Sequence, residues 1–104
     1  MLVLESKDGD GRIYVFPLGE APAVVTIGRA KDNDIVLADP TVSRHHAVII
    51  LKSESIEVED LESANGTWAD QEKVTERKVL KSGSAIKIGN LHFILKEASP
   101  EKGV

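Results

Sequence analysis

The stretch that decides the fold is His46-Ala47-Val48-Ile49-Ile50-Leu51, followed after a short polar break by Glu54-Ser55-Ile56-Glu57-Val58-Glu59-Asp60. The first run is almost continuously apolar, which is typical of a strand buried on both faces. The second run alternates strictly, so Ile56 and Val58 are predicted to face inward and the acidic side chains outward. Neither run has a helical period, and together they favour a β-rich fold.

Short strand patterns continue on both sides of this centre. They cover residues 2–4, 12–16, 23–27, 35–37, 66–69, 84–88 and 91–95, and turn-forming residues separate them. Gly89-Asn90 is predicted to be a two-residue hairpin turn, because both positions tolerate a positive φ. The one candidate helix, residues 71–78, is weakened by the β-branched pair Val74-Thr75. Many short strands of this kind indicate an all-β sandwich or barrel.

Length and composition limit the organisation of the chain. The sequence has 104 residues with a formal net charge of −4, and 41% of it is hydrophobic. This size and composition predict one globular domain with one core. We expect the domain to span residues 1–96 and a polar tail to follow over residues 97–104.

Several classes of protein are disfavoured. The chain has no cysteine, so we expect no disulfide, thiol nucleophile or cysteine-ligated metal, and a reducing compartment such as the cytoplasm fits. The first six residues lack a basic n-region, and no apolar run approaches the ~18 residues of a membrane span. We therefore expect no membrane partner. The acidic balance and an aromatic content of only 4% argue against nucleic acid.

Three strand-end loops carry unusual polar content. They contain Arg29, then Ser43-Arg44, then Asn65. The set supplies two guanidinium groups, a hydroxyl and an amide, without a carboxylate, and it therefore suits the binding of an anion rather than the transfer of a proton. Phosphate fits best, because two arginines roughly balance the charge of about −1.5 to −2 on a phosphorylated residue.

Other uses of these residues are weaker. His45 and His46 are adjacent in a strand, so their side chains face opposite sides and cannot share a metal ion. A hydrolase built on Ser43 would lack the Gly-x-Ser-x-Gly elbow. We therefore expect no enzyme activity, no metal and no cofactor. Ser43 could also cap the turn after Pro40, and the two arginines could simply be solvated surface residues.

The Asn65-Gly66 pair and the single tryptophan have plain structural explanations too. An ordinary hairpin turn would explain Gly66, because glycine accepts a positive φ without steric cost. It explains Asn65 less well, since the long preceding loop is expected to leave that side chain free to project. Trp68 begins a short strand, and packing is favoured over a role in ligand stacking.

A series of motifs runs in order through most of the chain. It comprises Gly28-Arg29, Asn33-Asp34-Ile35-Val36-Leu37, Val42-Ser43-Arg44-His45-His46-Ala47, Asn65-Gly66-Thr67 and Leu80-x-x-Gly83-x-x-Ile86-x-Ile88-Gly89. This series resembles the forkhead-associated (FHA) domain family. The resemblance implies an FHA-type β-sandwich of about eleven mostly antiparallel strands, with functional loops at one end. It also implies non-catalytic binding of phosphothreonine in an extended segment of a partner protein.

The resemblance implies a role for each matching residue. Arg29, Ser43 and Arg44 would contact the phosphate and the adjacent peptide, and Asn65 would hydrogen-bond the peptide backbone. His46 would brace the phosphate loop from beneath. Gly28 and Gly66 would contribute backbone. A Ser/Thr protein kinase is implied upstream of the phosphorylated partner.

The sequence departs from the family pattern at two places. Ala64 stands where the family often has a Thr or Ser before the asparagine, which is expected to weaken binding. Asp70-Gln71 replaces a second Asn-Gly turn, which is expected to leave the site unchanged. The alternative function is a phosphate-independent interaction or oligomerisation module, which would bind through an acidic edge strand at residues 54–60 or through the faces of the sandwich.

Overall fold

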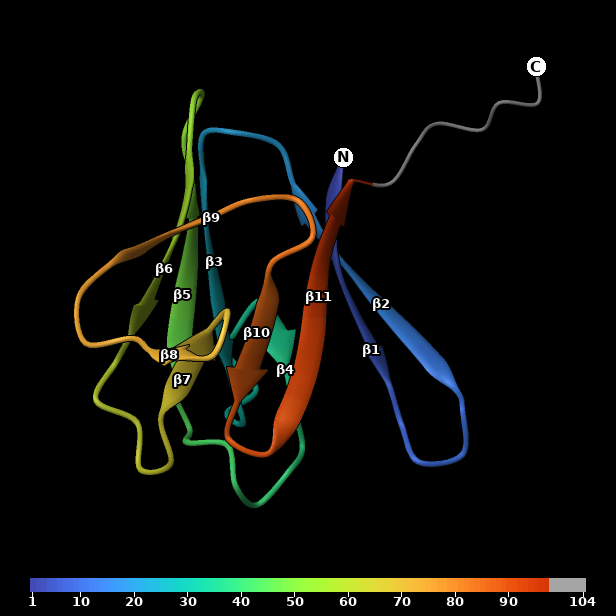
Figure 1. The fold of residues 1–104 in the computed structure, drawn as a ribbon. Coiled ribbons are helices and arrows are strands. Elements are labelled where there is room, and N and C mark those ends of the chain that lie inside the picture. The colour runs from blue at the N-terminus through green and yellow to red at the C-terminus, as the bar shows by residue number, and fades with distance from the viewer. Residues whose placement is uncertain (98–104) are drawn as a thin grey trace.

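The computed structural model describes residues 1–97 and shows two β-sheets packed face to face, with eleven strands and no helix in that range (Figure 1). One sheet contains β1 (Leu2–Lys7), β2 (Ile13–Gly19), β7 (Thr67–Ala69), β8 (Glu72–Lys73), β10 (Ala85–Ile88) and β11 (Leu91–Glu97). The other contains β3 (Ala23–Gly28), β4 (Ile35–Val36), β5 (Ala47–Leu51), β6 (Ile56–Asp60) and β9 (Lys78–Leu80). The prediction of an all-β sandwich of about eleven strands is confirmed.

The six-stranded sheet has the order β2-β1-β11-β10-β7-β8, and every pairing in it is antiparallel. The β1–β2 hairpin extends away from the body of the sandwich (Figure 1). β10 and β11 pair through Ile88 and Leu91, so Gly89-Asn90 forms the predicted two-residue turn, with a φ of 58° at Gly89. This hairpin is confirmed.

The five-stranded sheet has the order β4-β3-β5-β6-β9, and only β3 and β4 pair in parallel. Two expectations were wrong here. β6 lies between β5 and β9, so residues 54–60 form no edge strand, and the carboxylates of Glu57 and Glu59 are paired with Lys52 and Arg77. β5 is fully buried on one face only, because alternate residues along it are only half-buried.

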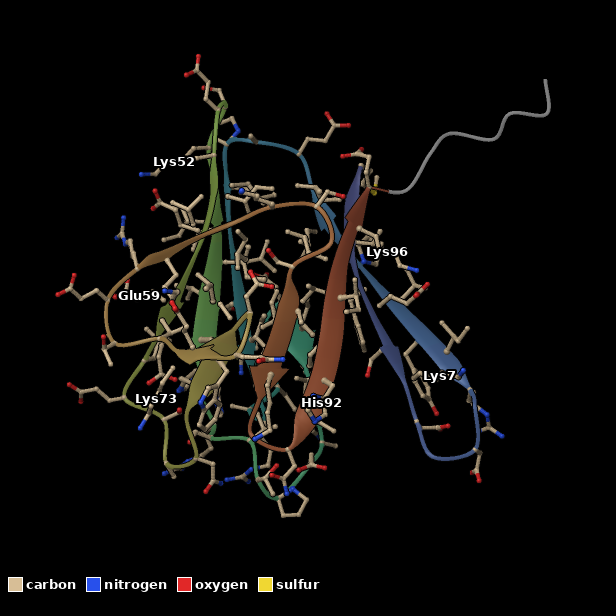
Figure 2. All side chains as sticks on the ribbon, viewed as in Figure 1. Lys7, Lys52, Glu59, Lys73, His92 and Lys96 are labelled. Atoms are coloured by element: carbon tan, nitrogen blue, oxygen red, sulfur yellow. The ribbon has the colours of Figure 1, made fainter. Side chains whose placement is uncertain are left out.

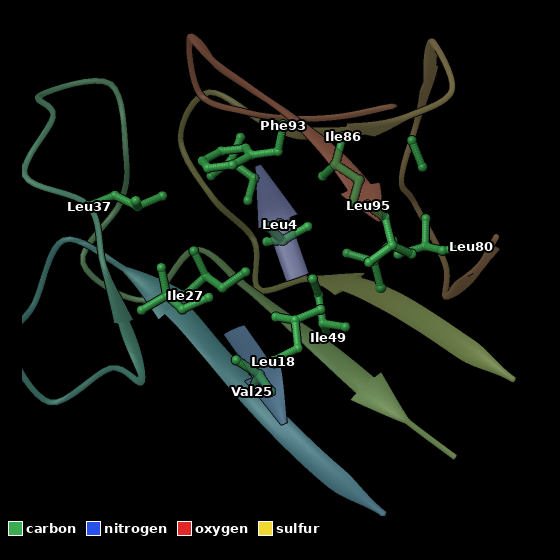
Figure 3. Packing of buried hydrophobic residues seen from close by; sticks show 14 of the residues in the cluster. Leu4, Leu18, Val25, Ile27, Leu37, Ile49, Leu80, Ile86, Phe93 and Leu95 are labelled. Atoms are coloured by element: carbon green, nitrogen blue, oxygen red, sulfur yellow. The ribbon is translucent and has the colours of Figure 1, made fainter. Parts of the chain in front are cut away.

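The core lies between the two sheets and is built from alternate residues of their strands (Figure 3). Ile27, Ile49, Val58, Ile88 and Leu95 have no exposed surface. At ~25 cal/mol per Å² of apolar surface, complete burial stabilises each such side chain by roughly 1.5–3 kcal/mol. The strand ends, including the loops that carry the candidate site, are therefore held by a rigid frame.

The candidate helix over residues 71–78 was wrong. The chain instead turns at Asp70-Gln71, enters the short strand β8, and buries Val74 before it reaches β9. Both turn residues have a positive φ, 50° at Asp70 and 74° at Gln71, which is the backbone of a tight hairpin turn. β8 pairs with β7 in a local hairpin, and the long-range pairing of β7 with β10 ties that hairpin to the sheet.

The last strand, β11, ends at Glu97. The predicted domain boundary after residue 96 stays a prediction, and the predicted tail lies outside the described residues except for Glu97. No segment of residues 1–97 forms a helix that could span a membrane.

Candidate functional site

Three loops meet at one end of the sandwich, the lower end in Figure 1. They connect β3 to β4, β4 to β5, and β6 to β7. Backbone hydrogen bonds join the first two loops: the Arg29 N–H donates to the Ser43 carbonyl at 3.0 Å, and the Ala30 N–H donates to the Arg44 carbonyl at 3.1 Å. The structure therefore brings the backbones of Arg29, Ser43 and Arg44 side by side.

Gly28 makes this close approach possible. A Cβ built on Gly28 would lie 2.1 Å from the carbonyl oxygen of Arg44 and 2.8 Å from Nδ2 of Asn33. No side chain fits in that space, since the nearest atom belongs to the backbone. The glycine thus sets the distance between the end of β3 and the loop that carries Ser43 and Arg44.

The two arginines lie on adjoining loops, and neither has a local counter-charge. Both side chains are exposed, and Arg29 donates from Nε to the Val42 carbonyl at 3.0 Å, which directs its guanidinium toward the second loop. Within residues 1–97, no carboxylate lies within 4.0 Å of either guanidinium. In a chain with a net charge of −4, two unpaired arginines on adjoining loops attract an anion.

His46 lies beneath these loops and connects two of them. Its side chain has no exposed surface. Nδ1 accepts the backbone N–H of Ser43 at 3.0 Å, and Nε2 therefore carries the proton that it donates to the Gly66 carbonyl at 2.8 Å. The imidazole holds the second and third loops at a fixed separation and does not reach the surface.

Ser43 and Asn65 also connect the second and third loops, through hydrogen bonds nearer the surface than those of His46. The Ser43 hydroxyl oxygen accepts the backbone N–H of Ala64 at 2.9 Å, and the Asn65 side-chain amide donates to the Thr41 carbonyl at 2.8 Å. The expectation that the Asn65 side chain projects freely was wrong, because one of its donors is already used within the protein. Its amide oxygen and its second N–H point toward no partner among residues 1–97 and can serve a peptide backbone.

Gly66 is required by both its backbone and its surroundings. Its φ is 87°, and a Cβ at this position would lie 2.8 Å from the ring of Trp68. Trp68 therefore packs directly against the loop that carries Asn65. Its ring also lies under the ammonium group of Lys87, which is 4.3 Å from the ring centroid.

Three supporting residues were not identified as candidates from the sequence. Thr41 accepts from Asn65 through its carbonyl and from the Asn90 N–H through Oγ1, so it links the β10–β11 turn to the site. Asn33 is almost fully buried and donates from Nδ2 to the carbonyls of Ala30 and Arg44. Asp39, rather than Ser43, caps the turn after Pro40 by accepting the Thr41 N–H. Asn33 belongs to the motif series, but no feature of the neighbouring sequence indicates a role for Thr41 or Asp39.

Asp60 organises the third loop. Its carboxylate accepts the hydroxyls of Ser63 and Thr67, each at 2.6 Å, and the Ser63 N–H at 3.0 Å. Partial burial opposes ionisation, but these hydrogen bonds outweigh it and lower the pKa of Asp60 below its ordinary value. Ser63 in turn accepts the Gly66 N–H, so the hydroxyl in this loop comes from Ser63, next to Ala64.

The other polar groups near the site do not assemble a metal centre. His45 is exposed and pairs with Asp32 at 3.0 Å, whereas His46 is buried. The prediction that these two histidines lie in a strand was wrong, because both precede β5. Across residues 1–97, no three His, Asp or Glu side chains come together in an arrangement that could hold a metal ion.

Comparisons with known proteins identify the family of this chain. The family model described as the FHA domain matches residues 25–89, which include all of the predicted site residues. The transcriptional regulatory protein EmbR of Mycobacterium tuberculosis is 41% identical over 71 residues, which cover 68% of this chain and 18% of EmbR. The chain spans between 9% and 45% of the length of the first curated relatives that it matches.

Solved structures match almost the whole chain. The FHA domain of CT664 from Chlamydia trachomatis has a TM-score of 0.86 at 28% identity, covering 94% of this chain and 98% of that domain. A structure described as an analysis of phosphothreonine-dependent FHA domain interactions has a TM-score of 0.78 at 31% identity, with 95% and 98% coverage.

EmbR solved in complex with a low-affinity phosphopeptide has a TM-score of 0.76 at 34% identity, covering 97% of this chain and 26% of that one. The motif series, the sandwich and the family match agree. This chain belongs to the FHA domain family.

Proposed function

We propose that this chain is a non-catalytic module that binds phosphothreonine in an extended segment of a partner protein. The observation that carries the proposal is the pair of exposed guanidinium groups of Arg29 and Arg44, which lack a neighbouring carboxylate within the described part of the chain. The phosphothreonine-dependent FHA structure and the EmbR–phosphopeptide complex support the ligand class. The enzyme responsible for the phosphate would be a Ser/Thr protein kinase, and the cytoplasm is the compartment we propose for the encounter.

Each site residue has a distinct task in this proposal. Arg29 and Arg44 neutralise the phosphate, and the Ser43 hydroxyl donates to a phosphate oxygen while it still accepts from Ala64. Asn65 aligns the peptide backbone with its free amide groups. Gly28, His46 and Gly66 hold the three loops in place without touching the ligand.

A preference for phosphothreonine over phosphoserine requires more than burial of the extra methyl group. One buried carbon contributes ~0.8 kcal/mol, which corresponds to about a fourfold difference in affinity. Restriction of the β-branched side chain to one rotamer supplies a further contribution.

Isothermal calorimetry with matched peptides tests the proposal. We expect a phosphothreonine peptide drawn from an oriented library to bind, its unphosphorylated form to bind at least tenfold more weakly, and Arg29→Ala to lose at least tenfold in affinity because it removes a charge-assisted contact. Arg12→Ala, which removes an exposed arginine in the β1–β2 turn, is the matched control and should bind as the wild type does.

Equal affinity for the phosphorylated and unphosphorylated peptides would favour the alternative of a phosphate-independent module. Superimposable titrations of wild type and Arg29→Ala would remove Arg29 from the site.

A further inference from the structure

The outer face of the six-stranded sheet carries a groove of about 850 Å³ that the phosphate site does not use. Cross-strand pairing defines its floor. One row joins His92, Lys87 and Trp68 across β11, β10 and β7, and a second row joins Glu5, Ile94 and Ala85. Lys7 and Ile13, which pair with each other near the end of the β1–β2 hairpin, line the far side of the groove. The groove therefore crosses the sheet from β7 to β2.

The floor of the groove is apolar and partly exposed. Ile13 is 56% exposed and Ile94 is 37% exposed, although both are large aliphatic side chains. Trp68 is half-buried and lines the groove. Covering these side chains would remove apolar surface from water, which is favourable at ~25 cal/mol per Å².

The charges around this floor are mainly positive. Lys7 and Lys87 line the groove, and Lys73 lies 6.0 Å from the Trp68 ring centroid. None of the three lysines has a carboxylate within 4.0 Å among residues 1–97, whereas the one acid in the lining, Glu5, is already paired with Lys96. Figure 2 shows Lys7 and Lys73 on either side of His92. A segment with acidic and apolar residues complements this surface.

The groove is continuous with the loops of the phosphate site. Trp68 forms its end at β7 and packs against Gly66, the residue that follows Asn65. A peptide held by Asn65 and leaving the phosphate site on this side meets Trp68 first. Where β1 is paired with β11, β7 and β2 are four strand spacings of ~4.8 Å apart, or ~19 Å, which about six extended residues span.

We propose that this groove binds an acidic, apolar segment of about six residues in the same phosphorylated partner, close to its phosphothreonine. The proposal rests on the proposed function, because phosphate binding delivers the segment to the groove. Once the phosphothreonine is bound, the second contact is intramolecular and gains from a high effective concentration.

The experiment uses the full chain and two synthetic peptides without tryptophan. The first is a seven-residue phosphothreonine peptide selected from the library. The second is the same peptide extended by Asp-Leu-Glu-Phe-Asp-Leu, prepared with the extension at either end. We expect one extended form to bind at least tenfold more tightly and to change the fluorescence of Trp68, the one tryptophan of the chain. An extension with lysine in place of the acids should give no gain.

Two variants test the groove itself. Ile94→Glu and Lys87→Glu should each abolish the gain from the extension and leave binding of the short peptide unchanged. Val24→Glu, on a residue 60% exposed on the other sheet, is the matched control and should keep the gain. Thermal unfolding of each variant shows that the fold is retained.

The outcomes separate a failure of the groove proposal from a failure of the proposed phosphothreonine binding. If the short peptide binds but neither extension improves affinity, or if the gain survives in both groove variants, the groove assignment is wrong and phosphothreonine recognition stands. If the short phosphopeptide does not bind, both are wrong. Sedimentation that shows a dimer of the wild type, lost in Ile94→Glu, would overturn the proposal in favour of a second copy of this chain in the groove.

Discussion

Replacement of His46 by alanine tests how the fold supports the site. The imidazole is completely buried and makes two hydrogen bonds, accepting from the Ser43 N–H at 3.0 Å and donating to the Gly66 carbonyl at 2.8 Å. These two partners belong to different loops. His46→Ala therefore removes the link between the loops without removing any group that faces solvent.

The size of the effect follows from these contacts. A buried donor or acceptor left without a partner costs ~1–3 kcal/mol, and two are left here. The space vacated by the ring adds ~1 kcal/mol or more. The expected loss is about 3–7 kcal/mol, out of a typical total stability of about 5–15 kcal/mol for a domain. At about 4–8 °C per kcal/mol, Tm should fall by at least ~12 °C.

Urea and thermal unfolding measure this loss directly. The adjacent His45→Ala is the control, because His45 is exposed and its pairing with Asp32 at the surface contributes ~1 kcal/mol or less. Phosphopeptide affinity, measured at a temperature where the variant is folded, should also fall, since Ser43 and Asn65 lose their fixed separation. A His46→Ala protein within 1 kcal/mol of the wild type would refute the bridging role.

Three further perturbations test other parts of the frame. Gly28→Ala should destabilise the protein by ~2 kcal/mol or more and weaken phosphopeptide binding, because the new Cβ would lie 2.1 Å from the Arg44 carbonyl oxygen. Gly9→Ala is the control, since a Cβ there meets nothing within 4 Å, and it should change the free energy of unfolding by less than ~1 kcal/mol. Equal losses in the two variants would contradict the steric argument. Gln71→Gly should raise Tm by a few degrees, because it relieves a φ of 74° in a turn remote from the site, and an unchanged or lower Tm in calorimetry would speak against strain there. Because the pKa of Asp60 is lowered in the folded state, its ionised carboxylate stabilises the fold at pH values above the ordinary carboxyl pKa near 4, and this contribution is lost as pH falls through the folded-state pKa. Asp60→Asn should therefore lose less stability than the wild type between pH 7 and pH 3. Parallel curves of unfolding free energy against pH, measured with urea, would disprove this.

The periodicity of the chain predicted most of the strands, because an alternating half-buried strand leaves a direct pattern in the sequence. Val58 and the β10–β11 turn at Gly89-Asn90 were placed correctly for this reason. The pattern failed where tertiary pairing overrides local preference. Residues 71–78 carry no strong local signal, and their conformation depends on β7 and on the burial of Val74.

The alternation of polar and apolar residues could not predict the order of the strands in each sheet. The alternation of residues 54–60 predicts a strand with one buried face, but the same alternation occurs at a sheet edge and in its interior. β9, more than fifteen residues later in the chain, pairs with β6, so the acidic edge strand predicted as one of the two surfaces for the alternative function does not exist.

The chemistry of the candidate site was readable from the sequence alone, since Arg29, Ser43, Arg44 and Asn65 are donors and no carboxylate accompanies them in their motifs. Their spatial relation was not, because it depends on contacts between residues far apart in the chain. The Thr41 carbonyl accepts a hydrogen bond from the Asn65 side chain, and the His46 imidazole donates one to the Gly66 carbonyl. Gly28 has no Cβ, so the Arg44 carbonyl can lie against it. A sequence shows which groups are present, whereas only the packed fold decides which backbone atoms those groups meet.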